Sequence, residues 1–248
     1  MFDYLFVIVA LCYVLMQLIE SISFASRVAG KLTNRLSLGT TLQHSIFTAS
    51  RLFLPPLLLS LSLMIESDLS LQSFLIISIS LTLLAFFASL SVLIKFNYFQ
   101  LSFQRLFLLY QNNTIPTAII KLLFGKGVNS TPINLQLRPK VRDLSLKKII
   151  ASGFAYFFLS TGFLIAFSLA ILIPEYRMTM SQFTTAFHGI GAIVLSMYID
   201  PMISRSLDIQ LENRHWIDNI YAIFLGRVLA YLAAALIFSA LYFYALFT

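Results

Sequence analysis

The sequence predicts an all-α polytopic membrane protein with about six transmembrane helices, and two observations lead to this class. Of its 248 residues, 59% are hydrophobic and only 11% are charged, whereas a soluble domain carries roughly a quarter charged residues. The apolar residues form continuous runs of about 20 or more, long enough for a helix to cross a hydrocarbon layer about 30 Å thick. A transmembrane β-barrel is excluded, because it needs alternating segments of about ten residues.

The apolar runs define six predicted spans within one transmembrane domain of residues 1–248. They cover residues 4–26, 37–64, 69–94, 149–173, 180–199 and 217–247, with a predicted cytoplasmic section at 95–148. We expect the first run to remain in the mature protein. It lacks a positively charged n-region, carries Asp3 and is too long for a signal peptide.

Loop charges predict the orientation of the spans. The first loop carries Arg27, Lys31 and Arg35 without an acid, the third loop is strongly basic, and the fifth carries Arg205 and Arg214, whereas the second and fourth are not basic. The positive-inside rule then places the odd loops in the cytoplasm and both termini outside. Because the net charge of +7 lies mainly in these loops, it indicates orientation rather than nucleic-acid binding.

The cytoplasmic section contains two predicted helices and a linker. Polar residues at helical spacing in 95–111 predict an amphipathic helix that lies in the interface or extends the third span. A short apolar helix is predicted at 115–124, followed by a basic linker at 128–148 to which we assign no structure. Either these helices dock on the membrane surface without chemistry, or their basic surface gathers an anionic lipid headgroup.

Charged residues inside the first span are a functional signal. Glu20 and Arg27 are seven residues apart, so they share a helix face, with Ser23 between them. A charge at membrane depth costs about 2.5–3.5 kcal/mol on insertion scales. Arg27 can extend its side chain to the cytoplasmic interface, whereas Glu20 needs a partner or a water-filled cavity.

Arg51 lies near the centre of the second span, beside Ser50 and two turns after His44. One interpretation is a structural ion pair with Glu20. The other is a water-exposed cavity in which the planar guanidinium binds an anion such as phosphate. The following Pro55-Pro56 pair is expected to break the helix, which is tolerated at membrane depth where the backbone lines a cavity or is buried in protein.

The last two spans repeat this arrangement. Asp200-Pro201 is predicted to end the fifth span, Arg205 follows at its cytoplasmic end, and Arg227 lies inside the sixth span. The similarity to the earlier hairpin with Glu20 and Arg51 raises the hypothesis of a parallel internal repeat, as in some transporters.

The remaining polar residues predict no cofactor and no metal. The three histidines are scattered, and the single cysteine, Cys12, cannot form an intramolecular disulfide. His188 is expected to be a hydrogen-bonded residue of the bundle, and Gly189 and Gly191 to permit close helix packing. No phosphate loop or hydrolase motif occurs, which excludes an ATP-driven pump for this chain alone.

Several features together resemble the Amj family: Glu-Ser-x-Ser from Glu20, Ser-Arg-x-Ala-Gly around Arg27, Ser-Arg at Arg51, the chain length, the six spans and Asp200-Pro201. The resemblance implies a bacterial lipid II flippase, an alternate to MurJ, in the cytoplasmic membrane. The implied substrate is an undecaprenyl-pyrophosphate-linked peptidoglycan precursor. The implied partners are this lipid and membrane lipids, and association with cell-wall synthesis proteins or as a homodimer is left open.

On this hypothesis the arginines receive the headgroup. Arg51 and Arg227 hold the pyrophosphate, Arg27 and Arg205 receive it at the cytoplasmic face, and Glu20 positions them. The hydroxyls of Ser23 and Ser50 bind the sugar–peptide part of the headgroup. Three further residues are secondary candidates for substrate binding: His44, His188 and Asp200. Three alternatives stay open: a flippase for another undecaprenyl-linked lipid, a membrane enzyme acting on a polyprenyl phosphate, and a non-transporting scaffold whose buried charges only pair with each other.

Overall fold

A computed structural model of the chain describes residues 2–111, 113–123, 144–208 and 215–247, and the described residues form helices without strands. Six helical stretches are long and apolar enough to cross a membrane, which confirms the predicted class and number of spans. They are Tyr4–Leu32, Leu36–Glu66, Leu71–Ile94, Leu146–Leu172, Pro174–Leu207 and His215–Phe247.

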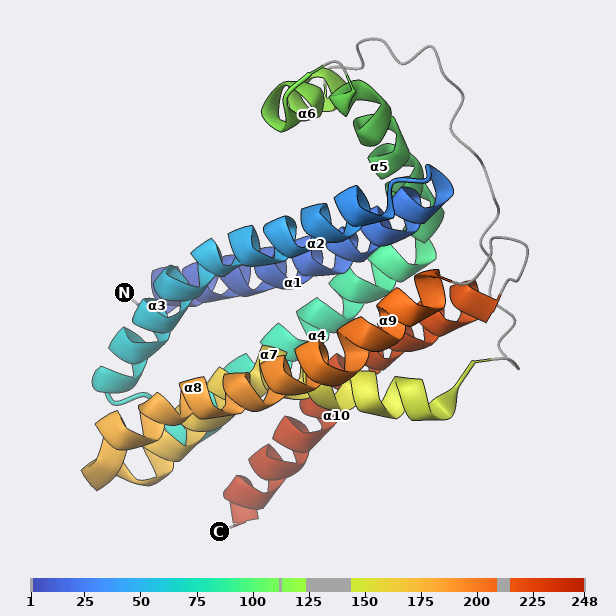
Figure 1. The fold of residues 1–248 in the computed structure, drawn as a ribbon. Coiled ribbons are helices and arrows are strands. Elements are labelled where there is room, and N and C mark those ends of the chain that lie inside the picture. Colours follow the sequence, from blue (N-terminus) through green and yellow to red (C-terminus); the bar gives the residue numbers. More distant parts are fainter. Residues whose placement is uncertain (1, 112, 124–143, 209–214, 248) are drawn as a thin grey trace.

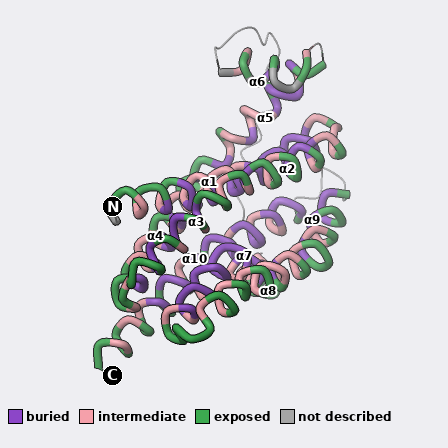
Figure 2. The backbone as a smooth tube through the Cα atoms, turned by 90° about the vertical axis from the view of Figure 1, so that its left-hand side faces the viewer, coloured by how far each residue is buried: buried purple, intermediate pink, exposed green. Residues whose placement is uncertain are grey.

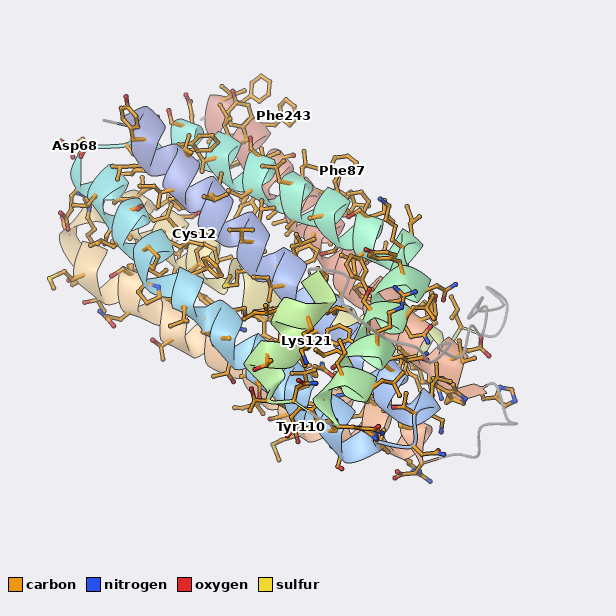
Figure 3. All side chains as sticks on the ribbon, turned by 90° about the horizontal axis from the view of Figure 1, so that it is seen from above. Cys12, Asp68, Phe87, Tyr110, Lys121 and Phe243 are labelled. Carbon is orange, nitrogen blue, oxygen red and sulfur yellow. The ribbon has the colours of Figure 1, made fainter. Side chains whose placement is uncertain are left out.

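The spans alternate in direction, so the basic connections gather at one end of the bundle, which we call the basic end. It contains the end of α1 (Phe2–Leu32), the start of α2 (Leu36–Ser50) and the end of α4 (Leu71–Ile94). The first and last described residues lie toward the opposite end (Figure 1). Asp68 also lies there, away from Tyr110 at the end of α5 (Phe96–Tyr110) (Figure 3).

The second span is interrupted near its middle. After α2, residues Arg51–Phe53 form a 3₁₀ turn, η1, and α3 (Leu54–Glu66) then begins with Pro55 and Pro56 in its first turn. Proline suits the first turn of a helix, because the donor that it lacks has no helical partner there. The expected break is therefore present, and it places Arg51 at the interruption.

The fifth span does not end at Asp200-Pro201, so that prediction was wrong. A π-helical turn, η4 (Leu195–Ile199), connects α8 (Arg177–Val194) to α9 (Asp200–Leu207) without a loop. Pro201 stands in the first turn of α9, where a missing N–H is tolerated. A π turn commonly marks a functional site, and here it precedes a carboxylate.

Two spans continue past basic residues that we placed in loops. α1 includes Lys31, and α7 (Leu146–Leu172) includes Lys148. Both lysines find partners inside the protein: Lys31 donates to the carbonyl oxygen of Leu207, and Lys148 donates to the side-chain oxygen of Asn219. Because these charges are bonded within the bundle, the helices do not need to end before them.

Two helices follow α4 at the basic end. α5 (Phe96–Tyr110) packs against α1, and α6 (Ile115–Leu123) follows it. The glutamine side chains of α5 face the protein interior, since Gln100 and Gln104 are buried, whereas Arg105 is exposed. Most of the predicted basic linker, up to residue 143, lies outside the described residues.

The two halves of the chain have the same arrangement of three spans. α1 packs against α2, α3 and α4, whereas α7 packs against α8 and α10 (His215–Phe247), and α4 and α10 join the halves. Of the residues in one apolar 18-residue stretch of each span, 67% are buried in α7 and 61% in α10, against 22% in the second span and 17% in the fifth. These two interrupted spans lie on the same face of the bundle (Figures 1 and 2).

A glycine sets the contact between α7 and α10. A Cβ atom at Gly226 would overlap the carbonyl oxygen of Ile149 and lie 2.9 Å from the Cβ of Ser152. We expect Gly226→Ala to force the helices apart and to lower stability by about 1–3 kcal/mol. Thermal unfolding in detergent can be followed by a fluorogenic thiol reagent, because the single cysteine, Cys12, is buried.

The matched control is Gly189→Ala in α8, where no atom lies within 4 Å of the added carbon. This variant should be at least as stable as the wild type, because alanine favours the helix over glycine. Equal unfolding midpoints for the two variants would contradict the packing argument.

Candidate functional site

The carboxylate of Glu20, on α1, is shared between two arginines from distant spans. Its Oε1 lies 3.2 Å from Nη2 of Arg51, and its Oε2 lies 3.0 Å from Nη2 of Arg227. Ser50 Oγ donates a hydrogen bond of 3.1 Å to the same Oε1. The ion pair between Glu20 and Arg51 that we considered from the sequence is therefore formed, and a third span takes part in it.

Arg227 is fully buried and held on several sides. Its Nε donates to the hydroxyl of Tyr231 at 3.0 Å, and its Nη2 donates to Oε1 of Gln17 at 3.2 Å. The ring of Tyr156 lies 4.6 Å from the guanidinium carbon. The hydroxyl of Tyr231 also donates to Gln17 Oε1, at 2.6 Å. Arg227 therefore serves to fix Glu20, and it has no exposed surface for a ligand.

We call Gln17, Glu20, Ser50, Arg51, Arg227 and Tyr231 the Glu20 cluster. Sequence analysis missed Gln17 and Tyr231, although a signal existed. Gln17 precedes Glu20 by three residues and Tyr231 follows Arg227 by four, and both spacings place side chains side by side on a helix.

Arg51 is the member of the Glu20 cluster that reaches the surface. Its side chain is 20% exposed, whereas those of Glu20 and Arg227 are 3% and 0% exposed. The guanidinium carbon lies 4.5 Å from the ring centroid of Phe47. Its Nη2 makes the ion pair with Glu20 but no hydrogen bond within the described residues. An anion that approaches this face can thus contact Arg51 while the buried pair behind it stays intact.

A second group of charges, the Asp200 cluster, consists of Arg27, His44 and Asp200. Arg27 Nη2 lies 2.7 Å from Asp200 Oδ1 and 3.2 Å from His44 Nε2. Because a guanidinium only donates, the Nε2 atom of His44 is the acceptor of this hydrogen bond. Arg27 is 1% exposed, and its Nε and Nη1 have no hydrogen-bond partner among the described residues.

The two clusters lie at different depths of the bundle. Glu20, Arg51 and Arg227 stand 12 to 15 residues from the basic end of their spans, or about 18–22 Å at 1.5 Å per residue. The residues of the Asp200 cluster stand 5 to 8 residues from the basic end of their spans, or about 8–12 Å. Together the clusters contain three arginines and two carboxylates, so one positive charge is left uncompensated.

The other predicted residues are not bonded to the side chains of either cluster. Ser23 is buried and donates to the backbone oxygen of Glu20, at 2.7 Å. Arg205 is exposed in the last turn of α9. His188 is half-buried on α8, hydrogen-bonded to the backbone of Leu159 and near enough to Arg51 and Glu20 to interact electrostatically with both. Of the two glycines predicted to permit close packing, Gly191 does so, because a Cβ there would lie 2.7 Å from the carbonyl oxygen of Ala155. The prediction was wrong for Gly189, where a Cβ would meet no atom within 4 Å.

Replacing Asp200 by Asn is expected to destabilise the protein by about 1–3 kcal/mol, because buried Arg27 loses its counter-ion. The Cys12 unfolding assay measures this change. The double variant Arg27→Gln/Asp200→Asn should recover part of the loss, and Glu66→Gln, at an exposed acid of α3, should have no effect. A double variant as unstable as the sum of its single variants would contradict a direct pairing.

Among the described residues, no three His, Cys, Asp or Glu side chains gather as a metal site would require. A model of the Amj family, described as "Alternate to MurJ", matches residues 12–246, a range that includes every member of both clusters. Neither the curated proteins nor the solved structures contain a match to the chain. Because the family match covers nearly the whole chain, the protein belongs to the Amj family.

Proposed function

We propose that the protein is a flippase that moves lipid II, the undecaprenyl-pyrophosphate-linked peptidoglycan precursor, from the inner to the outer leaflet of the bacterial cytoplasmic membrane. Family membership, which implies an alternate lipid II flippase, and the six spans support this role. The observation that carries the proposed mechanism is Arg51, an arginine at mid-depth whose side chain reaches the surface while its ion-pair partner stays buried.

A pyrophosphate needs such a residue in order to cross the bilayer. Moving an unpaired anion out of water into a hydrocarbon layer about 30 Å thick is very costly. An arginine offers two parallel N–H donors to a phosphate and stays charged. In our proposal Glu20, to which Ser50 also donates, holds Arg51 from behind, so that the remaining donors of Arg51 face the headgroup.

The proposed path has three positions along the bundle. On the positive-inside rule the basic end faces the cytoplasm, where exposed Arg205 makes the first contact. Arg27 lies about 8 Å from the basic end and is 1% exposed, so in this proposal its unpartnered Nε and Nη1 become available to the headgroup only when the contact with Asp200 opens. Arg51 receives the pyrophosphate at mid-depth. Arg227 has a supporting role in this proposal, because it is fully buried.

The test is a lipid II accessibility assay in cells whose only candidate flippase is this protein. An externally added enzyme that cleaves outward-facing lipid II reports the flipped fraction. We expect cleavage when the protein is present and a loss of cleavage when it is depleted. Absence of cleavage with correctly inserted protein would contradict the proposal.

The mass of lipid extracted from the same cells distinguishes a flippase from an enzyme that acts on a polyprenyl phosphate. Lipid extracted before the external enzyme is added should have an unchanged mass, because flipping breaks no bond. A new lipid mass that depends on the protein would favour the enzyme.

A further inference from the structure

The interrupted second span carries polar side chains where contact with lipid would require apolar ones. The exposed residues of α2 include Thr41, His44, Ser45 and Thr48, which share one helix face by their spacing of three, four and seven residues. This stripe begins at the basic end and leads to Arg51. Beyond the break the exposed positions are apolar, as at Leu52, Leu59 and Leu63.

The fifth span shows the same pattern in the opposite direction. Near the start of α8, Gln182 and Thr185 are exposed beside apolar Met178 and Phe183, whereas the exposed positions closer to the π turn are apolar only, as at Ile190 and Ile193. Because α2 and α8 run in opposite directions on one face of the bundle (Figure 1), their polar stretches cover different depths. The α2 stretch lies 5 to 12 residues from the basic end of its span, and the α8 stretch lies 8 to 11 residues from the opposite end of its span.

These side chains also lack internal partners, unlike the hydroxyls of another span. Within the described residues, Thr41, Ser45, Thr48, Gln182 and Thr185 have no side-chain hydrogen bond. On α4, by contrast, half-buried Ser80 and exposed Ser91 bond to their own helix: Ser80 Oγ donates to Ile76 O at 2.8 Å, and Ser91 Oγ donates to Ala88 O at 2.7 Å. Thr40 of α2 and Ser181 and Thr184 of α8 make bonds of the same kind. An unpaired hydroxyl in hydrocarbon is unfavourable, so water or a ligand is the natural partner of the five side chains without such a bond.

Two polar bridges connect the interrupted spans at their two ends. At the basic end Arg27 contacts both His44 of α2 and Asp200 of α9. At the opposite end Arg177, at the start of α8, donates to the carbonyl oxygen of Ile65 in α3 at 3.3 Å. The polar stretches of α2 and α8 therefore border the same region of the molecule, with Arg51 between them in depth.

We propose that Thr41, Ser45 and Thr48 of α2 and Gln182 and Thr185 of α8 form a polar track that binds the saccharide–peptide part of the headgroup. This inference rests on the proposed function. It adds a binding site for the saccharide–peptide part of lipid II, since Arg51 binds only the pyrophosphate. Sugar hydroxyls and peptide amides are neutral donors and acceptors, and the track offers neutral partners of both kinds. Such hydrogen bonds are weaker than those to charged groups, so a moving headgroup can exchange them.

The experiment uses single cysteines in the Cys12→Ala protein, reconstituted in liposomes with a charged thiol reagent on both sides. Thr41→Cys, Thr48→Cys and Thr185→Cys should react at least tenfold faster than two α4 controls. The controls are Ser80→Cys and Phe87→Cys, and Phe87 points away from the bundle (Figure 3). Equal rates at track and control positions would overturn the proposal, because the track would then face lipid.

Adding lipid II should slow the labelling of the track at least fivefold, whereas undecaprenyl pyrophosphate without the saccharide should leave Thr41→Cys unprotected. Protection by neither lipid, or equal protection by both, would overturn the assignment to the saccharide–peptide part.

Flipping of lipid II by the triple variant Thr41→Val/Ser45→Ala/Thr48→Val should be about tenfold slower than by the wild type, whereas the control Ser80→Ala/Ser91→Ala should flip it at the wild-type rate. A wild type that fails to flip lipid II while lipid II still protects the track would reject the proposed function and retain the binding site.

Discussion

Replacing Glu20 by Gln is expected to lower the stability of the protein by about 3–5 kcal/mol, the cost of leaving a buried charge without its partner. Glu20 is the carboxylate that faces both Arg227, which is fully buried, and Arg51. Glutamine keeps the shape and one acceptor, so the change isolates the charge. In the Cys12 labelling assay we expect the unfolding midpoint to fall by about 6–20 °C, given the chain length.

The double variant Glu20→Gln/Arg227→Gln provides the control for this interpretation. It removes the cation together with the anion, so it should be more stable than the sum of the single changes predicts. Wild-type stability of Glu20→Gln would show that Arg227 does not depend on the carboxylate.

Replacing Arg51 by Ala is expected to reduce lipid II flipping about 10- to 100-fold, which corresponds to the loss of one charge-assisted hydrogen bond of about 1.5–3 kcal/mol. Stability should change much less than in Glu20→Gln, because the pair between Glu20 and Arg227 remains. Arg51→Lys should retain part of the activity, since lysine keeps the charge but not the planar pair of donors. The accessibility assay measures all three proteins, with Arg105→Ala, at an exposed position of α5, as the control.

Inverting all three charges, Glu20→Arg/Arg51→Glu/Arg227→Glu, separates transport from a purely structural pairing, because exchanging Glu20 and Arg51 alone would place a second guanidinium against the buried Arg227. A scaffold whose charges only pair with each other should function with the charges inverted. The proposed flippase should lose activity, because the exposed position at the break would then carry a carboxylate. Full flipping by the inverted protein, or by Arg51→Ala, would reject the role of Arg51.

The sequence was sufficient for the number of spans and for the depth of the main charges. Apolar runs near 20 residues have few structural alternatives, and the positions of Glu20, Arg51 and Arg227 within their runs fix their depth. The pair between Glu20 and Arg51 was among the alternatives considered, because a buried acid needs a partner. The Pro55-Pro56 break also followed from local chemistry, since proline cannot continue a helix without losing a hydrogen bond.

The partners across the bundle could not be predicted in the same way. Arg27 and Asp200 are 173 positions apart, and which helices meet depends on shape at positions such as Gly226. The local signal at Asp200-Pro201 was misleading, because a π turn can continue a helix into a proline. The exposure of Thr41 and Thr48 also depends on which face of α2 packs against α1, and composition alone does not determine that face.

The glycine contact described for α7 and α10 has counterparts that fix two further helix pairs. A Cβ at Gly39 of α2 would lie 2.5 Å from the backbone oxygen of Ser26 in α1, and a Cβ at Gly191 of α8 would lie 2.7 Å from the carbonyl oxygen of Ala155 in α7. The backbones within each pair are thus locked, whereas α2 and α8 share no such contact. At the basic end Arg27 and Lys31 of α1 both bond to α9, at Asp200 and at the carbonyl oxygen of Leu207, whereas at the opposite end Arg177 of α8 bonds to Ile65 of α3. Polar bonds therefore join the two sides of the bundle separately at each end, and the buried pair of Glu20 and Arg227 joins α1 to α10 between them.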